Sequence, residues 1–377
     1  MFQRHYLISR HRRVMCQDSL LTEVSVTSLY VLTRHLTHHC ISNVTVATVC
    51  IPTLTHISHP CPSPCPKNYL TLPSHTAPHG LPCPFSSRLP RRPAGEWQGS
   101  FLFVQGADPQ LGLMKEWESG VVSAAGGDEW AEELRLARAA VAAVNRMRPR
   151  PRFLVLCGDL VHAMPGQANR AAQEEDLRAA LCELDPAIPL VLLPGNHDIG
   201  NAPTAATVEA YRRSWGDDYF AFWAGGARFL VLNSQLFVDA SLCPELAEEQ
   251  ERWLEEQLES YKAEGPRGPL VILQHTPLFL VAPDEDDDYF NVERHARRRL
   301  LDKFSAAGVC AVFTGHYHRN AGGRCGAVEV VVSSAIGCQI GSDVSGLRVV
   351  TVTEAGVRHR YYGMDQVPEC VELDVEQ

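Results

Sequence analysis

Short apolar blocks recur along the chain after residue 95, and each block ends in a glycine or a polar residue. An unbroken run of four or five apolar residues is typical of a strand buried on both faces, because alternate side chains point to opposite sides of a sheet. We therefore predict buried strands at 101–104, 153–156, 190–193, 229–232, 270–273 and 309–313.

Charged stretches with helical periodicity separate these apolar blocks. Strands and helices in alternation predict a largely parallel sheet covered by helices, which is an α/β fold. The end of the chain differs, because 328–333, 347–353 and 357–362 have the pattern of antiparallel strands and indicate a second sheet. The predicted helices are 128–147, 167–183, 203–214, 244–263 and 291–307.

The first 95 residues have a different composition from the rest. They contain 9 Lys and Arg against 2 acidic residues, so a chain of net charge −10 divides into a basic segment of +7 and an acidic remainder of −17. Repeated Pro, Thr, Ser, His and Cys mark 1–95 as low-complexity, and we predict a disordered or spurious extension there and one catalytic domain over 96–377. A zinc site is the alternative, although its spacing fits a zinc finger poorly. Its ligands would be Cys61, Cys65, His75 and His79.

The composition of the whole chain excludes several classes of protein. With 377 residues, 45% of them hydrophobic, the chain resembles an ordinary globular protein. No window reaches 18 consecutive apolar residues, so no membrane span is expected, and the acidic balance argues against broad nucleic-acid binding. The cysteines after Gly95 form no Cys-x-x-Cys pair, which favours thiols in a reducing cytosol and predicts a cytoplasmic protein.

Polar side chains of the types that bind metals follow five of the predicted strands. Parallel strands present their carboxyl ends at one edge of a sheet, where α/β proteins place their sites. A single histidine or Gly-Asp pair after a strand is usually a packing or turn residue, but five such blocks in order indicate a functional site. The blocks contain Asp108 and Gln110; Asp159; Asn196, His197 and Asp198; His275; and His316 and His318.

These ordered blocks resemble those of the calcineurin-like metallophosphoesterase superfamily. The sequence of residues 97–362 is similar to a calcineurin-like phosphoesterase domain with serine/threonine phosphatase activity. The resemblance implies an αββα sandwich, in which helices flank two mixed sheets and the strand-end loops hold a dinuclear metal centre. It also implies two divalent cations, with Mn, Mg, Fe and Zn all open, and a phosphoprotein substrate.

The resemblance assigns the first cation to Asp108, Gln110 and His318, with Asp159 bridging both cations. Gln110 departs from the pattern, because the family usually has a histidine there. An amide oxygen is a harder and weaker ligand than imidazole, so this position favours Mn or Mg over Zn. Contact between Gln110 and a metal-bound water is an equally open interpretation.

The resemblance assigns the second cation to Asn196, His275 and His316. His197, paired with Asp198, would then be the residue that protonates the leaving oxygen without binding metal. The chemistry of the residues agrees, since two cations held by a bridging carboxylate can activate a hydroxide for in-line attack on a phosphomonoester. No Gly-x-Ser-x-Gly motif offers a protein nucleophile instead.

Two other functions remain open at this stage. Gly158-Asp-Leu-Val-His162 and Pro194-Gly-Asn-His-Asp198 resemble the phosphodiesterase-like branch, so hydrolysis of a cyclic nucleotide or another diester is the first alternative. A catalytically weak scaffold is the second. The acidic run 284–288 is either a solvated loop or a site that recruits a basic peptide or a cation. Tyr289 follows it as a candidate cap over the site, and Arg319 is a candidate phosphate clamp.

Overall fold

The computed structural model of the protein describes residues 97–265 and 268–373. The predictions for the segment 1–95, including the zinc-site alternative, lie outside these residues.

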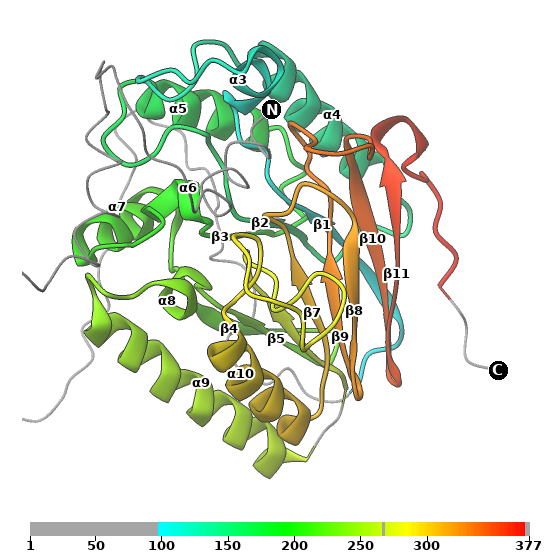
Figure 1. The fold of residues 1–377 in the computed structure, drawn as a ribbon. Coiled ribbons are helices and arrows are strands. Elements are labelled where there is room, and N and C mark those ends of the chain that lie inside the picture. The colour runs from blue at the N-terminus through cyan, green and yellow to red at the C-terminus, as the bar shows by residue number, and fades with distance from the viewer. Residues whose placement is uncertain (1–96, 266–267, 374–377) are drawn as a thin grey trace, which may run out of the picture. The chain divides into compact units, whose positions relative to one another are not determined.

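Eleven described strands form two mixed sheets (Figure 1). The five-stranded sheet has the order β11-β10-β1-β2-β3, in which β1, β2 and β3 are parallel and β10 is antiparallel to both of its neighbours. Its strands are β1 (Phe101–Gly106), β2 (Leu154–Cys157), β3 (Leu190–Leu193), β10 (Gly346–Thr353) and β11 (Gly356–Gly363).

The six-stranded sheet has the order β4-β5-β6-β7-β9-β8. Its four central strands are parallel, and the edge strands β4 and β8 are antiparallel to their neighbours. Its strands are β4 (Phe220–Ala224), β5 (Ala227–Val231), β6 (Leu270–Leu273), β7 (Val309–Thr314), β8 (Ala321–Cys325) and β9 (Val328–Val332).

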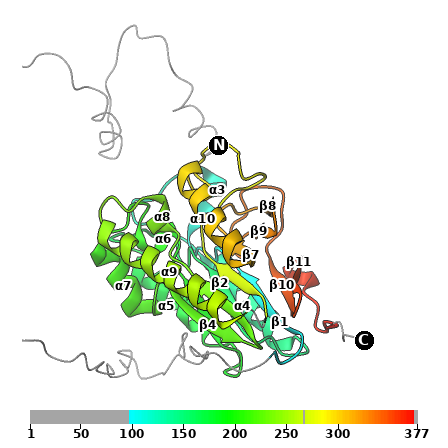
Figure 2. The same ribbon diagram turned by 90° about the horizontal axis from the view of Figure 1, so that it is seen from below.

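Helices cover the outer face of each sheet. Buried residues of α4, α5 and α7 form one apolar cluster with the five-stranded sheet, and those of α9 and α10 form another with the six-stranded sheet (Figures 1 and 2). The helices are α3 (Leu113–Ser119), α4 (Ala131–Arg146), α5 (Arg170–Leu181), α6 (Asn196–Ile199), α7 (Ala205–Trp215), α8 (Gln235–Val238), α9 (Pro244–Glu264), α10 (Arg294–Ala307) and the 3-10 helix η2 (Met364–Gln366).

A third apolar cluster lies between the two sheets and is rich in aromatic rings. Phe103 stacks on Phe153 with ring centroids 4.6 Å apart, and it meets Phe229 and Phe313 edge-on at 5.5 and 5.6 Å. Along β1 the side chains alternate, since Phe103 belongs to this inner cluster and Leu102 to the helix-covered one. Both faces of the strand are therefore buried, which explains its unbroken apolar sequence. The predicted αββα sandwich is confirmed.

The predicted strands and the five predicted helices agree with elements of the structure, but the short helices α3, α6 and α8 and two edge strands were not predicted. Strands β4 and β8 were not expected, and β8 has the weakly apolar sequence Ala-Gly-Gly-Arg-Cys at an edge. The prediction for the last three strands was wrong in part. Strands β10 and β11 extend the first sheet rather than a separate one, and β9 runs parallel to β7 because the unrecognised β8 reverses the chain between them.

Candidate metal centre

The predicted ligands stand at strand ends where the backbone is unusual. In residues 97–265 and 268–373, five non-glycine residues have a φ in the left-handed region, and all five are predicted ligands. Such a conformation costs free energy and persists only where the surrounding structure fixes it, and it concentrates at functional sites. The five residues are Asp108, Gln110, Asp159, His316 and His318, with φ of 49°, 36°, 49°, 67° and 52°.

Two overlapping groups of buried side chains lie at this edge of the sheets. In each group the candidate donor atoms all lie within 4.8 Å of one another. Asp159 belongs to both groups, so its carboxylate is placed where a ligand shared by two cations has to stand. The groups are Asp159, His275 and His316, and Asp108, Asp159 and His318.

The separations around His275 fit the coordination shell of a cation. Its Nε2 atom lies 3.1 Å from Nδ1 of His316, 3.2 Å from Oδ1 of Asn196 and 3.4 Å from Oδ2 of Asp159. With metal–ligand bonds of about 2.1 Å, neighbouring ligand atoms stand roughly 3.0 Å apart in an octahedral shell and roughly 3.4 Å apart in a tetrahedral one. The three separations from Nε2 of His275 therefore match those between neighbouring ligands of one small divalent cation.

Backbone carbonyls fix the orientation of the three imidazoles. His275 donates from Nδ1 to the carbonyl of Cys157 at 2.7 Å, and His316 donates from Nε2 to the carbonyl of Tyr289 at 3.0 Å. His318 donates from Nδ1 to the carbonyl of Cys338. Each ring thus turns its other nitrogen to the centre, the orientation that metal-binding histidines have. Nε2 of His275 and Nδ1 of His316 face each other at 3.1 Å, so either a proton or a cation has to lie between their lone pairs.

Burial favours neutral rings at His316 and His318, whereas the carboxylates of the centre favour a positive charge beside them. Burial lowers the pKa of His316 to about 3 and that of His318 to about 4, so both rings are neutral near pH 7, the form that binds metal. Burial also acts to lower the pKa of His275, but the carboxylates of Asp159 and Asp108 outweigh it and raise that pKa to about 9. Without metal, a proton on His275 offsets the negative charge of Asp159 and Asp108. A bound cation would offset that charge instead.

Asn196 presents its oxygen to the same place. Its Nδ2 group donates to Oδ1 of Asn201 at 3.0 Å and to the hydroxyl of Tyr289 at 3.1 Å. These two bonds use the nitrogen of the amide, so Oδ1 is the atom left facing His275. An amide oxygen is an accepted ligand for hard divalent cations.

Gln110 also presents an unpaired oxygen. Its Nε2 group lies 3.4 Å from Nδ1 of His162, whereas Oε1 is buried and has no hydrogen-bond partner among the described residues. A buried carbonyl-type oxygen without a partner is costly, which a cation or a metal-bound water would relieve. The geometry accepts either of the two interpretations of Gln110.

His197 and Asp198 do not form the expected pair. His197 donates its backbone amide to Oδ1 of Asp159 at 2.8 Å and its ring Nδ1 to the carbonyl of His162 at 2.6 Å. The carboxylate of Asp198 folds back onto the start of α6 and accepts from the amides of Gly195 at 2.7 Å and Leu160 at 3.1 Å. The expected pairing of His197 with Asp198 is therefore not found, because the Asp198 carboxylate bonds backbone amides at the start of α6 and after β2 instead.

Three residues around the centre were given no fixed role from the sequence. His162 contacts both Gln110 and His197, Glu116 contacts His162, and Tyr289 holds two predicted ligands. His162 follows Asp159 by three residues, so its place in the same loop was available as a signal. The candidate cap Tyr289 does reach the centre, whereas Glu116 lies on α3, an element that the apolar pattern did not predict.

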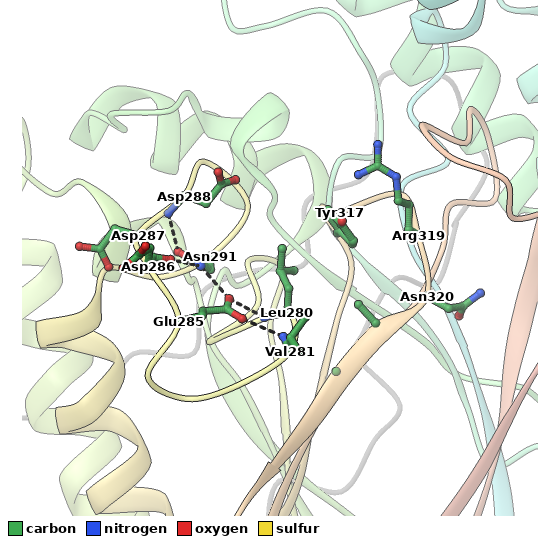
Figure 3. A pocket seen from close by; sticks show the side chains of 12 residues that line it. Leu280, Val281, Glu285, Asp286, Asp287, Asp288, Asn291, Tyr317, Arg319 and Asn320 are labelled. Carbon is green, nitrogen blue, oxygen red and sulfur yellow. Dashed lines mark hydrogen bonds between the residues drawn. The ribbon is translucent and has the colours of Figure 1, made fainter. Parts of the chain in front are cut away.

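A pocket of about 600 Å³ is lined by the acidic run, Tyr317 and Arg319 (Figure 3), and Tyr317 stands between the predicted ligands His316 and His318 in the sequence. The acidic run forms one wall, and its Glu285 accepts from the amides of Leu280 and Val281 at 2.7 and 2.8 Å. On the other wall, Arg319 stacks over the ring of Tyr317 at 4.7 Å. The acidic run is thus an ordered loop with internal hydrogen bonds.

The protein is an αββα sandwich with two overlapping buried groups of His and Asp side chains that could hold metal ions. The sequence profile of the calcineurin-like phosphoesterases matches residues 126–320. The chain is 57% identical over 274 residues to "Serine/threonine-protein phosphatase CPPED1" of Danio rerio, a match that covers 73% of this chain and 88% of that protein. It is 55% identical over 282 residues to the Homo sapiens protein of the same name, covering 74% and 89%. The chain belongs to the calcineurin-like phosphoesterase family.

A solved structure shares the fold at low sequence identity. It is described as "GAP50 the anchor in the inner membrane complex of Plasmodium", with a TM-score of 0.50, 11% identity, and coverage of 74% of this chain and 90% of that one. This likeness shows the fold alone.

Proposed function

We propose that the chain is a metal-dependent serine/threonine-protein phosphatase that hydrolyses phosphomonoesters on proteins. The observation that carries the proposal is the position of Asp159 in both buried groups of donors. The activity follows the name of relatives that are 55 to 57% identical over nearly nine tenths of their own length.

We propose the following division of roles. Asp159 would be shared by two divalent cations; Asp108, His318 and Gln110 would hold the first, and Asn196, His275 and His316 the second. When bound, such a pair of cations polarises the phosphoryl oxygens and lowers the pKa of water toward about 7. The oxygen-rich donor set at Gln110 favours Mn or Mg there over Zn.

His197 is proposed as the acid that gives a proton to the leaving serine or threonine oxygen. Its backbone amide donates to Oδ1 of Asp159 at 2.8 Å, which fixes the backbone of His197 beside that carboxylate. Nδ1 donates to the carbonyl of His162, which leaves Nε2 as the ring nitrogen for the leaving oxygen. Asp198 supports this arrangement by fixing the backbone at Leu160 and Gly195, the neighbours of Asp159 and Asn196.

The location in the cell and the substrate are proposed on separate grounds. None of the helices described here is long and apolar enough to cross a bilayer. The cytoplasmic location stays a prediction from the cysteine pattern. The phosphoprotein substrate is proposed from the activity of the relatives.

The test is hydrolysis by the full-length protein of a phosphoserine peptide, a cyclic nucleotide and a bis-aryl phosphate, with Mn, Mg, Zn or EDTA. Cleavage of the peptide that needs metal and is lost in Asp159→Asn, with circular dichroism unchanged, is the expected result. Cleavage of the diesters alone would replace the proposal with a phosphodiesterase. Folded protein that cleaves none of the substrates with any metal would indicate a scaffold.

A further inference from the structure

His162 touches two proposed functional residues, although nothing so far gives it a role. It follows β2 in the loop that carries Asp159, and its side chain is only 12% exposed. Its ring contacts Gln110 through Nδ1, and its backbone carbonyl contacts the ring of His197. One residue thus links a proposed ligand of the first cation with the proposed acid.

Glu116 fixes which nitrogen of His162 carries the proton. The carboxylate is anchored, because Oε1 accepts from the amides of Ser123 at 2.8 Å and Gly127 at 2.9 Å. Oε2 lies 3.2 Å from Nε2 of His162, and a carboxylate there is an acceptor only. Nε2 therefore carries the hydrogen, and Nδ1 of the neutral ring is left as an acceptor.

This arrangement determines which end of the Gln110 amide turns to the centre. Nδ1 of His162 accepts only from the nitrogen of the amide, at 3.4 Å, so Oε1 must point away from His162. Oε1 is the buried oxygen that has no partner among the described residues. Without His162, the amide loses the contact that distinguishes its oxygen end from its nitrogen end.

The carbonyl and the ring of His162 also orient the ring of His197. The carbonyl accepts from Nδ1 of His197 at 2.6 Å, and the two rings stack with centroids 4.9 Å apart and an angle of 27° between their planes. The hydrogen bond sets the tautomer of His197, and the stacking sets the plane of its ring.

We propose that His162, oriented by Glu116, is a positioning residue that turns the oxygen of Gln110 to the first cation and holds the ring of His197 for proton transfer. The inference rests on the proposed function. Gln110 stands where the family usually has a histidine. In this proposal His162 orients the Gln110 amide so that its oxygen can take the place of the imidazole as a ligand.

The experiment measures Mn²⁺ binding to the full-length protein by calorimetry and electron paramagnetic resonance, beside the metal dependence of peptide hydrolysis. His162→Phe keeps the ring stack and the backbone carbonyl but cannot accept from Gln110. We expect it to weaken binding of one of two Mn²⁺ ions by about tenfold to a hundredfold, the usual effect of losing a support of a ligand. His162→Asn, whose oxygen can replace Nδ1 as acceptor, should bind Mn²⁺ more tightly than His162→Phe.

A double-mutant cycle separates positioning from general structural damage. In a Gln110→Ala protein there is no amide to orient, so adding His162→Phe should change Mn²⁺ affinity little. His359→Phe is the matched control, since His359 also faces a glutamate, with Nε2 3.4 Å from Oε1 of Glu329. It should bind Mn²⁺ as the wild type does.

Wild-type affinity in His162→Phe, or an equal loss in the presence and absence of Gln110, would overturn the inference. Wild-type protein that binds two Mn²⁺ ions without cleaving any phosphoester would refute the proposed function instead. The double-mutant cycle on Mn²⁺ affinity would still test the role of His162.

Discussion

Gly195 lies directly against the carboxylate of Asp159, so closely that a β-carbon built on Gly195 would overlap Oδ1. The backbone at Gly195 is extended, and the glycine is required there by the close approach rather than by its φ. Gly315 repeats this relationship, since its β-carbon would stand 2.5 Å from Oδ2 of Asp108. Glycines next to the proposed ligands therefore make room for the carboxylates of the centre.

Gly195→Ala is expected to disable the centre. The added methyl group would overlap both Oδ1 and the backbone nitrogen of Asp159, so both must shift, and a displacement of about 1 Å at a catalytic group can cost about 10²-fold in rate. Peptide hydrolysis and Mn²⁺ binding should both fall. In Gly308→Ala, where φ is 76° but the space is open, the cost should be about 1 kcal/mol of stability with metal binding kept.

His197→Ala is expected to slow hydrolysis according to the leaving group. Loss of a general acid typically costs about 10² to 10⁴ in rate, and serine alkoxide needs that proton to leave. Nitrophenolate leaves readily without it, so hydrolysis of p-nitrophenyl phosphate should fall much less. Steady-state rates on both substrates at saturating Mn²⁺ provide the measurement, and equal losses on the two would assign His197 a role other than the acid.

Chelation is expected to lower both activity and thermal stability. One ion at a hundred times its dissociation constant stabilises the folded state by about 2.7 kcal/mol, which corresponds to roughly 5 °C in melting temperature for a domain of this size. Scanning calorimetry of full-length protein with Mn²⁺ and with EDTA tests this. Asp159→Asn is the control and should show almost no metal-dependent shift, whereas an equal shift in that variant would place the stabilising ion elsewhere.

Removal of residues 1–95 is expected to leave the phosphatase unchanged. The described elements and every proposed site residue lie within 97–373. Residues 96–377 expressed alone should therefore keep the melting temperature and kcat/KM of the full chain. A clear loss of either quantity would show that the basic segment belongs to the catalytic unit, contrary to the division predicted from composition.

The strand-end ligands were predictable because local sequence determines where a strand stops. Asp159 and His275 each follow an apolar block almost at once, and parallel strands deliver such residues to one edge. Supports that arrive from distant loops were not predictable in this way. Glu116 reaches His162 only through the packing of α3, and the link from Tyr289 to Asn196 spans 93 positions. The partners of Asp198 were missed because backbone amides compete for a carboxylate without any mark in the sequence.

The hairpin between β10 and β11 turns at the opposite edge from the proposed ligands. Val352, near the end of β10, pairs with Phe101 at the start of β1, whereas the ligands follow the other end of β1. The eight residues of β10 place this turn about 25 Å from that edge. Glu354 and Ala355 in the turn are exposed. A dye or a surface tether attached there would leave the whole ligand-bearing face open, so a bulky phosphoprotein could approach an immobilised molecule without obstruction.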